Sequence, residues 1–168
     1  MSKIREILND KESVLVFDVD GVLALFEWGE HNHYADDDES WAKMYEAGGT
    51  YYTEKFVIKK MQEFLKDKDK SRIYVITKAF NDNEADDKRN FVNKFYGIPK
   101  DHVYYVTDNK DKAKVLCEIK KGYKELPDYK LVMIEDTIDI LTNIYENTGF
   151  STAHISSFLD WQFGLKIV

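Results

Sequence analysis

Short runs of apolar residues alternate along this chain with longer segments in which apolar residues recur every three or four positions. An unbroken apolar run between polar signals is typical of a strand buried on both faces, whereas the wider spacing predicts an amphipathic helix. The apolar runs predict strands at 14–20, 72–77, 102–106, 131–134 and 150–155. The wider spacing predicts helices at 2–11, 39–47, 54–66, 83–96, 111–121 and 137–147.

Strands that alternate with helices are typical of βαβ units, in which parallel strands form one sheet covered by helices on both faces. We therefore predict an α/β fold, a Rossmann-like three-layer sandwich around a parallel five-stranded sheet. The segment 24–53 breaks the alternation, because it is rich in aromatic residues and has no long period. We interpret it as a small cap insertion after the first strand, within a single domain that spans 1–168. Its aromatic side chains would either form a small core of their own or stack on a nucleobase.

Composition narrows the classes of function. The chain has 168 residues, of which 43% are hydrophobic and 33% charged, as is usual for a globular domain. Its net charge of −7 disfavours extended binding of nucleic acid or of an anionic membrane surface. No apolar segment is long enough to cross a bilayer or to act as a signal peptide. The one cysteine, Cys117, excludes an internal disulfide and indicates a reducing compartment such as the cytoplasm. Its apolar neighbours predict that Cys117 faces the protein core from the helix at 111–121.

The first predicted strand ends in two carboxylates, Asp18 and Asp20, which Gly21 follows. Ligands of open α/β sheets bind at the carboxyl ends of the strands, and glycine allows a sharp turn there. Two like charges this close are unfavourable unless a hard cation such as Mg²⁺ compensates them. Alternatively, one aspartate caps a turn and the other is solvated. We favour the metal, because the pair directly follows a buried strand.

Polar residues also follow the other predicted strands. Thr77 and Lys78 come at the end of the second strand, and Glu135 and Asp136 at the end of the fourth. A lysine opens the helix after the third strand, and three neighbours compete for that position: Lys110, Lys112 and Lys114. Carboxyl ends of parallel strands meet at one edge of a sheet, so we expect these side chains to gather there.

This set of residue types suits the cleavage of a phosphomonoester. Asp18 can act as a nucleophile that forms an aspartyl-phosphate, and Asp20 as a general acid and base. A Mg²⁺ bound by Asp18, Asp136 and the backbone carbonyl of Asp20 would let the nucleophile approach a phosphate dianion. The Thr77 hydroxyl, a lysine and the N–H groups around Gly21 would bind phosphoryl oxygens.

Two residues of the set have open roles. Lys78 either adds a phosphate contact or is a solvated loop lysine. Glu135 is either a further metal ligand or a neighbour that holds a water molecule.

The string Phe17-Asp18-Val19-Asp20-Gly21-Val22-Leu23 resembles the first motif of the haloacid dehalogenase (HAD) superfamily of Mg²⁺-dependent phosphotransferases. The further polar residues follow in a similar order: a threonine, a lysine and an acidic pair. The resemblance implies Asp18 as nucleophile and Asp20 as acid and base, and it favours Lys112, which an apolar turn follows. The second aspartate implies a phosphatase rather than a dehalogenase. The chain looks most like the 5′(3′)-deoxyribonucleotidases with a compact cap.

The acidic pair departs from the family's pattern. Glu135 stands where the family has glycine or aspartate, and the positions of a later acid hold Ile140 and Leu141. Asp139 comes one residue early, so either it fills that role from a shifted turn or the role is missing.

We therefore predict a Mg²⁺-dependent phosphatase that acts on a nucleoside monophosphate or a similar small phosphorylated metabolite, as a 5′-nucleotidase does. Two alternatives stay open: a phosphatase of polynucleotide ends, and a non-catalytic HAD-like binding or regulatory domain. The sequence pattern fixes neither the substrate nor the oligomeric state.

Overall fold

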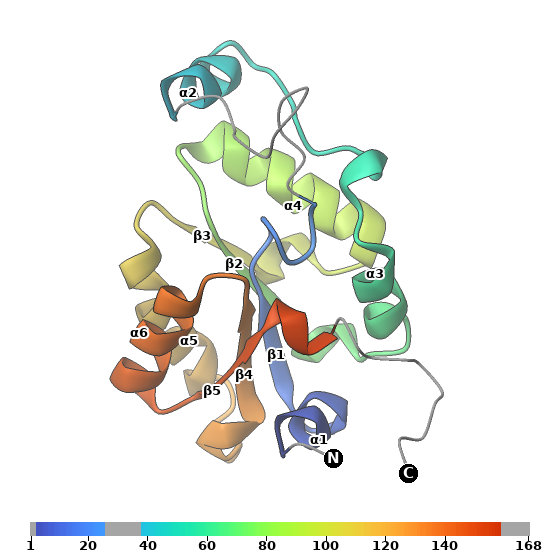
Figure 1. Ribbon diagram of the computed structural model, residues 1–168, viewed down its shortest axis with the longest axis vertical. Helices are drawn as coiled ribbons and strands as arrows, with labels where there is room; N and C mark the ends of the chain where they lie inside the picture. The colour runs from blue at the N-terminus through green and yellow to red at the C-terminus, as the bar shows by residue number, and fades with distance from the viewer. Residues whose placement is uncertain (1–2, 26–37, 159–168) are drawn as a thin grey trace.

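The computed structural model describes residues 3–25 and 38–158, and its centre is one parallel sheet (Figure 1). The strand order is β3-β2-β1-β4-β5, and every neighbouring pair is parallel. The strands are β1 (Val14–Phe17), β2 (Ile73–Lys78), β3 (Val103–Val106), β4 (Leu131–Glu135) and β5 (Ser151–His154). The predicted parallel five-stranded sheet is thus confirmed, with the Asp18 motif directly after its central strand.

Helices cover both faces of this sheet, which confirms the predicted three-layer α/β fold. Helices α5 and α6 lie on one face, and α1, α3 and α4 lie on the other (Figure 1). The helices are α1 (Lys3–Asn9), α2 (Asp38–Glu46), α3 (Lys59–Lys66), α4 (Asp82–Tyr96), α5 (Lys112–Lys121) and α6 (Ile138–Thr148). None of these described helices has the length and apolar character needed to cross a membrane.

The alternation of side chains along β1 separates the two halves of the core. Leu15 and Phe17 belong to the buried cluster that α3 and α4 complete, whereas Val14 and Val16 belong to the cluster beneath α5 and α6. Successive side chains of a strand point to opposite faces, so a fully apolar strand must be covered twice. All four residues of β1 are buried, as the unbroken apolar run predicts.

Three local predictions were wrong. Strand β1 stops at Phe17 rather than at residue 20, because the carbonyl of Val19 accepts hydrogen bonds from N–H groups of residues 22–24 and closes a turn. The helix predicted at 54–66 begins only at Lys59, after a 3₁₀ turn. Cys117 is exposed rather than buried, because α5 turns Leu116 and Ile119 inward and leaves Cys117 on its outer side.

The predicted cap insertion at 24–53 is described only in part, because residues 26–37 lie outside the described ranges. Its predicted short helix is present as α2, which packs on α4 above the sheet (Figure 1). The described aromatic residues of this segment pack on one another: Trp41 contacts Tyr45 and Tyr51 edge to face, and Tyr51 stacks on Phe56. These rings form no separate core, because Tyr45 belongs to the buried cluster of β1, α3 and α4, and Trp41 and Tyr51 pack against that cluster.

The described end of the chain packs back on the body. Phe158 is 1% exposed, and its ring lies edge to face with Phe64 of α3, with 5.1 Å between the ring centroids. We expect Phe158→Ala to lower the free energy of unfolding by about 3–5 kcal/mol, as for other buried phenyl rings. Urea denaturation measures this loss. Tyr145→Ala is the control, because Tyr145 is exposed on α6, and its change should stay within about 0.5 kcal/mol. Equal losses would contradict the packing.

Candidate active site

Three carboxylates meet at the carboxyl ends of the two central strands. The N–H group of Asp18 donates to the carbonyl of Ile134 at 3.0 Å, which continues the pairing of β1 with β4. This register places Asp18 beside the residues that end β4. One oxygen each of Asp18, Glu135 and Asp136 lies within 4.8 Å of the others. The predicted ligands Asp18, Glu135 and Asp136 are thus brought together, in an arrangement that suits a hard cation.

Gly21 allows Asp136 to reach this cluster. Its φ of +74° is one that side chains rarely adopt. A Cβ atom added there would overlap Oδ2 of Asp136 and come within 2.7 Å of its Cγ. The turn after β1 therefore needs glycine for two reasons: its backbone conformation, and the carboxylate that fills the space of a side chain.

Lys112 is the lysine that faces the cluster. It is 1% exposed, and its Nζ donates to Oε2 of Glu135 at 2.7 Å and lies 3.2 Å from Oδ1 of Asp18. The rival lysines lie elsewhere: Lys110 is exposed, and Lys114 pairs with Asp111 on the outer side of α5. The geometry agrees with Lys112 as the lysine that the motif order favours.

The charged groups of this cluster shift one another's pKa values. Burial and the charge of Asp18 raise the pKa of Glu135, and burial also raises the pKa of Asp18, although Lys112 opposes that shift. Burial alone would lower the pKa of Lys112, but the two carboxylates outweigh burial and raise it. With all three carboxylates ionised, one ammonium would leave two negative charges, which a divalent cation would neutralise. The donor set therefore fits Mg²⁺.

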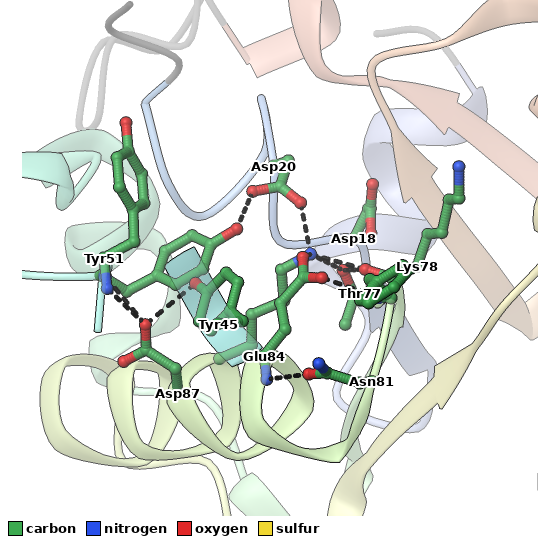
Figure 2. A network of polar contacts seen from close by, with 12 residues as sticks. Asp18, Asp20, Tyr45, Tyr51, Thr77, Lys78, Asn81, Glu84 and Asp87 are labelled. Carbon is green, nitrogen blue, oxygen red and sulfur yellow. Dashed lines mark hydrogen bonds and ion pairs between the residues drawn. The ribbon is translucent and has the colours of Figure 1, made fainter. Parts of the chain in front are cut away.

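Asp20 belongs to a second cluster, whose contacts Figure 2 shows. Oδ2 of Asp20 accepts from Nζ of Lys88 at 2.7 Å, and Oδ1 accepts from the hydroxyl of Tyr52 at 2.5 Å. Its carboxylate is thus separate from the three grouped ligands. The prediction that the backbone carbonyl of Asp20 binds the metal remains a prediction.

Lys88 is buried on α4 and is shared among several acceptors. Besides Asp20, its Nζ pairs with Oε1 of Glu84 at 2.9 Å and donates to the carbonyl of Lys78 at 2.5 Å. Oγ1 of Thr77 accepts more weakly, at 3.4 Å. Burial alone would lower the pKa of Lys88, but the charges of Asp20 and Glu84 raise it. The ammonium therefore stays charged between two carboxylates.

The other predicted phosphate-binding residues divide into two kinds. Thr77 is 1% exposed, and its hydroxyl lies inside the Lys88 cluster. Lys78 takes part through its backbone carbonyl, whereas its exposed side chain extends away from the cluster (Figure 2). A phosphate would have to approach from that open side for the Lys78 ammonium to contact it.

His154 supports the backbone of Asp136, whereas Asp139 lies outside the cluster. His154 at the end of β5 donates from Nε2 to the carbonyl of Asp136 at 2.7 Å, because its Nδ1 accepts from the N–H of Ser156. The backbone of Asp136 is thus held from a neighbouring strand. Asp139 is exposed and lies outside the three-carboxylate group, so α6 does not bring it into the cluster in place of the later acid of the family's pattern.

Sequence reasoning missed Lys88, Glu84 and the hydroxyl of Tyr52. The four-residue spacing of Glu84 and Lys88 on a predicted helix was a readable signal for an ion pair, but it usually marks a solvated face. Only the packing of α4 against the turn after β1 shows that this pair is buried on Asp20. No protein-family model matches the chain, and no curated protein matches it.

The contact between Gly21 and Asp136 yields a prediction with a matched control. We expect Gly21→Ala to displace the Asp136 carboxylate and to weaken Mg²⁺ binding on the order of tenfold, as loss of ligand support does. Gly149→Ala is the control, because Gly149 has a similar φ of +71° but open space around it. Both variants should lose about 1–2 kcal/mol of stability through backbone strain. Calorimetric titration with Mg²⁺ separates them, and equal affinities would refute the role of Gly21.

A second prediction concerns the ammonium of Lys112. Lys112→Met leaves Asp18 and Glu135 buried without the ammonium, so the free energy of unfolding should fall by about 3 kcal/mol where both carboxylates are ionised. Burial raises the pKa of Glu135 to about 9, so this full loss is expected above about pH 9. The loss should shrink as the pH is lowered, because protonation removes the unpaired charges. Lys114→Met, at a side chain that is 82% exposed, should change stability by less than about 0.5 kcal/mol. Urea denaturation without divalent cations measures both, and a pH-independent loss would contradict the pairing.

Proposed function

We propose that this protein is a Mg²⁺-dependent phosphomonoester hydrolase of the HAD type. The observation that carries the proposal is the grouping of Asp18, Glu135 and Asp136 beside the buried ammonium of Lys112. These three carboxylates would hold the ion. Bound Mg²⁺ would supply positive charge to the phosphoryl oxygens and to the carboxylates around them. The resemblance of residues 17–23 to the first HAD motif supports the same chemistry.

Asp18 has the position required of a nucleophile. It directly follows the central strand, and Lys112 faces one of its oxygens. The proposed reaction begins with Asp20 protonated: a carboxylate oxygen of Asp18 attacks phosphorus, the bond from phosphorus to the leaving oxygen breaks, and that oxygen takes the proton of Asp20. Water then gives a proton to Asp20 and attacks the aspartyl-phosphate, which releases inorganic phosphate and restores Asp18.

Three exposed apolar side chains that follow strands of the site support a leaving group with an apolar face. Leu25, Phe80 and Ile138 are 47%, 53% and 67% exposed. Each follows a strand whose end contributes to the site: β1, β2 and β4, respectively. A nucleoside monophosphate offers a phosphate for the carboxylate end and a base for such side chains. The one cysteine of the chain supports a cytoplasmic setting for this enzyme.

The test is phosphate release with and without Mg²⁺ from nucleoside 5′- and 3′-monophosphates, sugar phosphates and 3′- or 5′-phosphorylated oligonucleotides. We expect the wild type to hydrolyse nucleoside monophosphates and Asp18→Asn to lose activity by at least about 10³-fold, because the nucleophile is removed. Asp139→Asn is the control, as an exposed aspartate outside the cluster, and it should keep its activity.

Each other outcome has a meaning. Faster release of phosphate from oligonucleotide ends would favour the polynucleotide phosphatase. Release of phosphate from sugar phosphates alone would exclude nucleoside monophosphates as the substrate. Full activity of Asp18→Asn would refute the nucleophile. Mg²⁺ binding without hydrolysis of any member of the panel would favour the non-catalytic HAD-like domain.

A further inference from the structure

Helix α4 contacts both Asp20 and the segment 45–52, which ends in Tyr52. Two adjacent residues of the helix make these contacts: Lys88 bonds directly to Asp20, whereas Asp87 bonds to the segment (Figure 2). Asp87 is 8% exposed, so these bonds form where water competes little. The helix therefore determines where the segment lies relative to the carboxylate.

Asp87 binds the segment through three donors that converge on one carboxylate oxygen. Oδ2 of Asp87 accepts from the hydroxyl of Tyr45 at 3.0 Å and from the N–H groups of Tyr51 and Tyr52 at 2.6 and 3.2 Å. Hydrogen bonds to an ionised acceptor are roughly twice as strong as neutral ones. Asn83 adds a bond to the carbonyl of Tyr45, so the same face of α4 fixes this residue twice.

The side chain of Tyr52 links the backbone that Asp87 binds to the carboxylate of Asp20. The ring packs on Phe91 of α4 at 5.5 Å and edge to face on Tyr51, and its hydroxyl donates to Oδ1 of Asp20. Burial and the charge of Asp20 raise the pKa of Tyr52 far above its usual range, so the hydroxyl remains a donor. Lys88 holds the other oxygen of Asp20. Both oxygens of the carboxylate are thus fixed from α4, one of them through Tyr52.

We propose that Asp87 and Tyr52 are positioning residues for Asp20, and that Asp87 acts only through Tyr52. This inference rests on the proposed acid and base role of Asp20. No hydrogen bond joins Asp87 to Asp20 among the described residues, whereas the segment that Asp87 binds carries the Tyr52 hydroxyl that donates to Asp20. The hydroxyl of Tyr52 orients the Asp20 carboxylate through its hydrogen bond, and Asp87 determines where that hydroxyl lies.

A double-mutant cycle tests this order of action. Tyr52→Phe keeps the ring and removes the hydroxyl, and Asp87→Asn keeps the shape but removes the charge that strengthens the three bonds. Each variant should lower kcat on the order of tenfold, because small misplacements of a reacting group have large effects. KM and Mg²⁺ affinity should stay unchanged. The double variant should lose no more than the more impaired single variant, whereas independent roles would multiply the two losses.

Tyr105→Phe is the matched control. Tyr105 also donates to an aspartate, Asp82, at 2.6 Å, but this exposed pair lies outside both clusters. Its removal should leave kcat unchanged. If Asp87→Asn does not fold, Tyr52→Phe decides alone, and an unchanged kcat in that variant would overturn the proposal.

A crystal structure of Asp87→Asn tests the geometry independently of activity. We expect the Tyr52 hydroxyl to lie away from Asp20 in that variant. A hydroxyl that stays in place would overturn the proposal, as would a displaced hydroxyl with full kcat. If the wild type hydrolyses nothing on the substrate panel, the proposed function fails, while a displaced hydroxyl would still show that Asp87 positions Tyr52 on Asp20.

Discussion

Two buried ammonium groups hold the site together, and each is shared between two carboxylates. Lys112 lies between Asp18 and Glu135, and Lys88 lies between Asp20 and Glu84. A carboxylate taken out of water is strongly destabilising unless an opposite charge and hydrogen bonds compensate for it. The two aspartates that end the central strand therefore depend on lysines that come from helices on opposite faces of the sheet.

Asp18 and Asp20 are two residues apart in the sequence but lie in two different chemical environments. The cluster around Asp18 has an excess of negative charge and an arrangement of oxygens that suits a cation. The cluster around Asp20 is instead filled with hydrogen-bond donors: an ammonium and a phenol. In the proposed reaction, the first environment would suit a nucleophile beside a metal and the second would suit the group that transfers the proton. The layered fold supplies both environments from one short motif.

The strands and the polar residues at their carboxyl ends are predictable from the sequence, because each depends on a short run of neighbouring residues. Buried parallel strands leave unbroken apolar runs, and their carboxyl ends locate Asp18, Thr77 and Glu135. The choice of Lys112 over its neighbours needed the motif order as well. Lys88 was not predictable, because its role depends on how α4 packs against a turn that lies 68 residues earlier. Cys117 was misplaced because apolar neighbours in sequence do not fix the face of a helix.

The sequence order of the charged residues also matters for how the chain folds. During synthesis Asp18, Asp20, Lys88 and Lys112 all emerge before β4, so the partner of Lys112 at Glu135 arrives 23 residues after the lysine itself. Until then the central strand lacks one neighbour, and Lys112 lacks one of its two carboxylates. Non-local pairing of this kind slows folding. The part of the chain that precedes β4 therefore contains every residue of the Lys88 cluster, whereas the Lys112 cluster is completed only by Glu135 and Asp136.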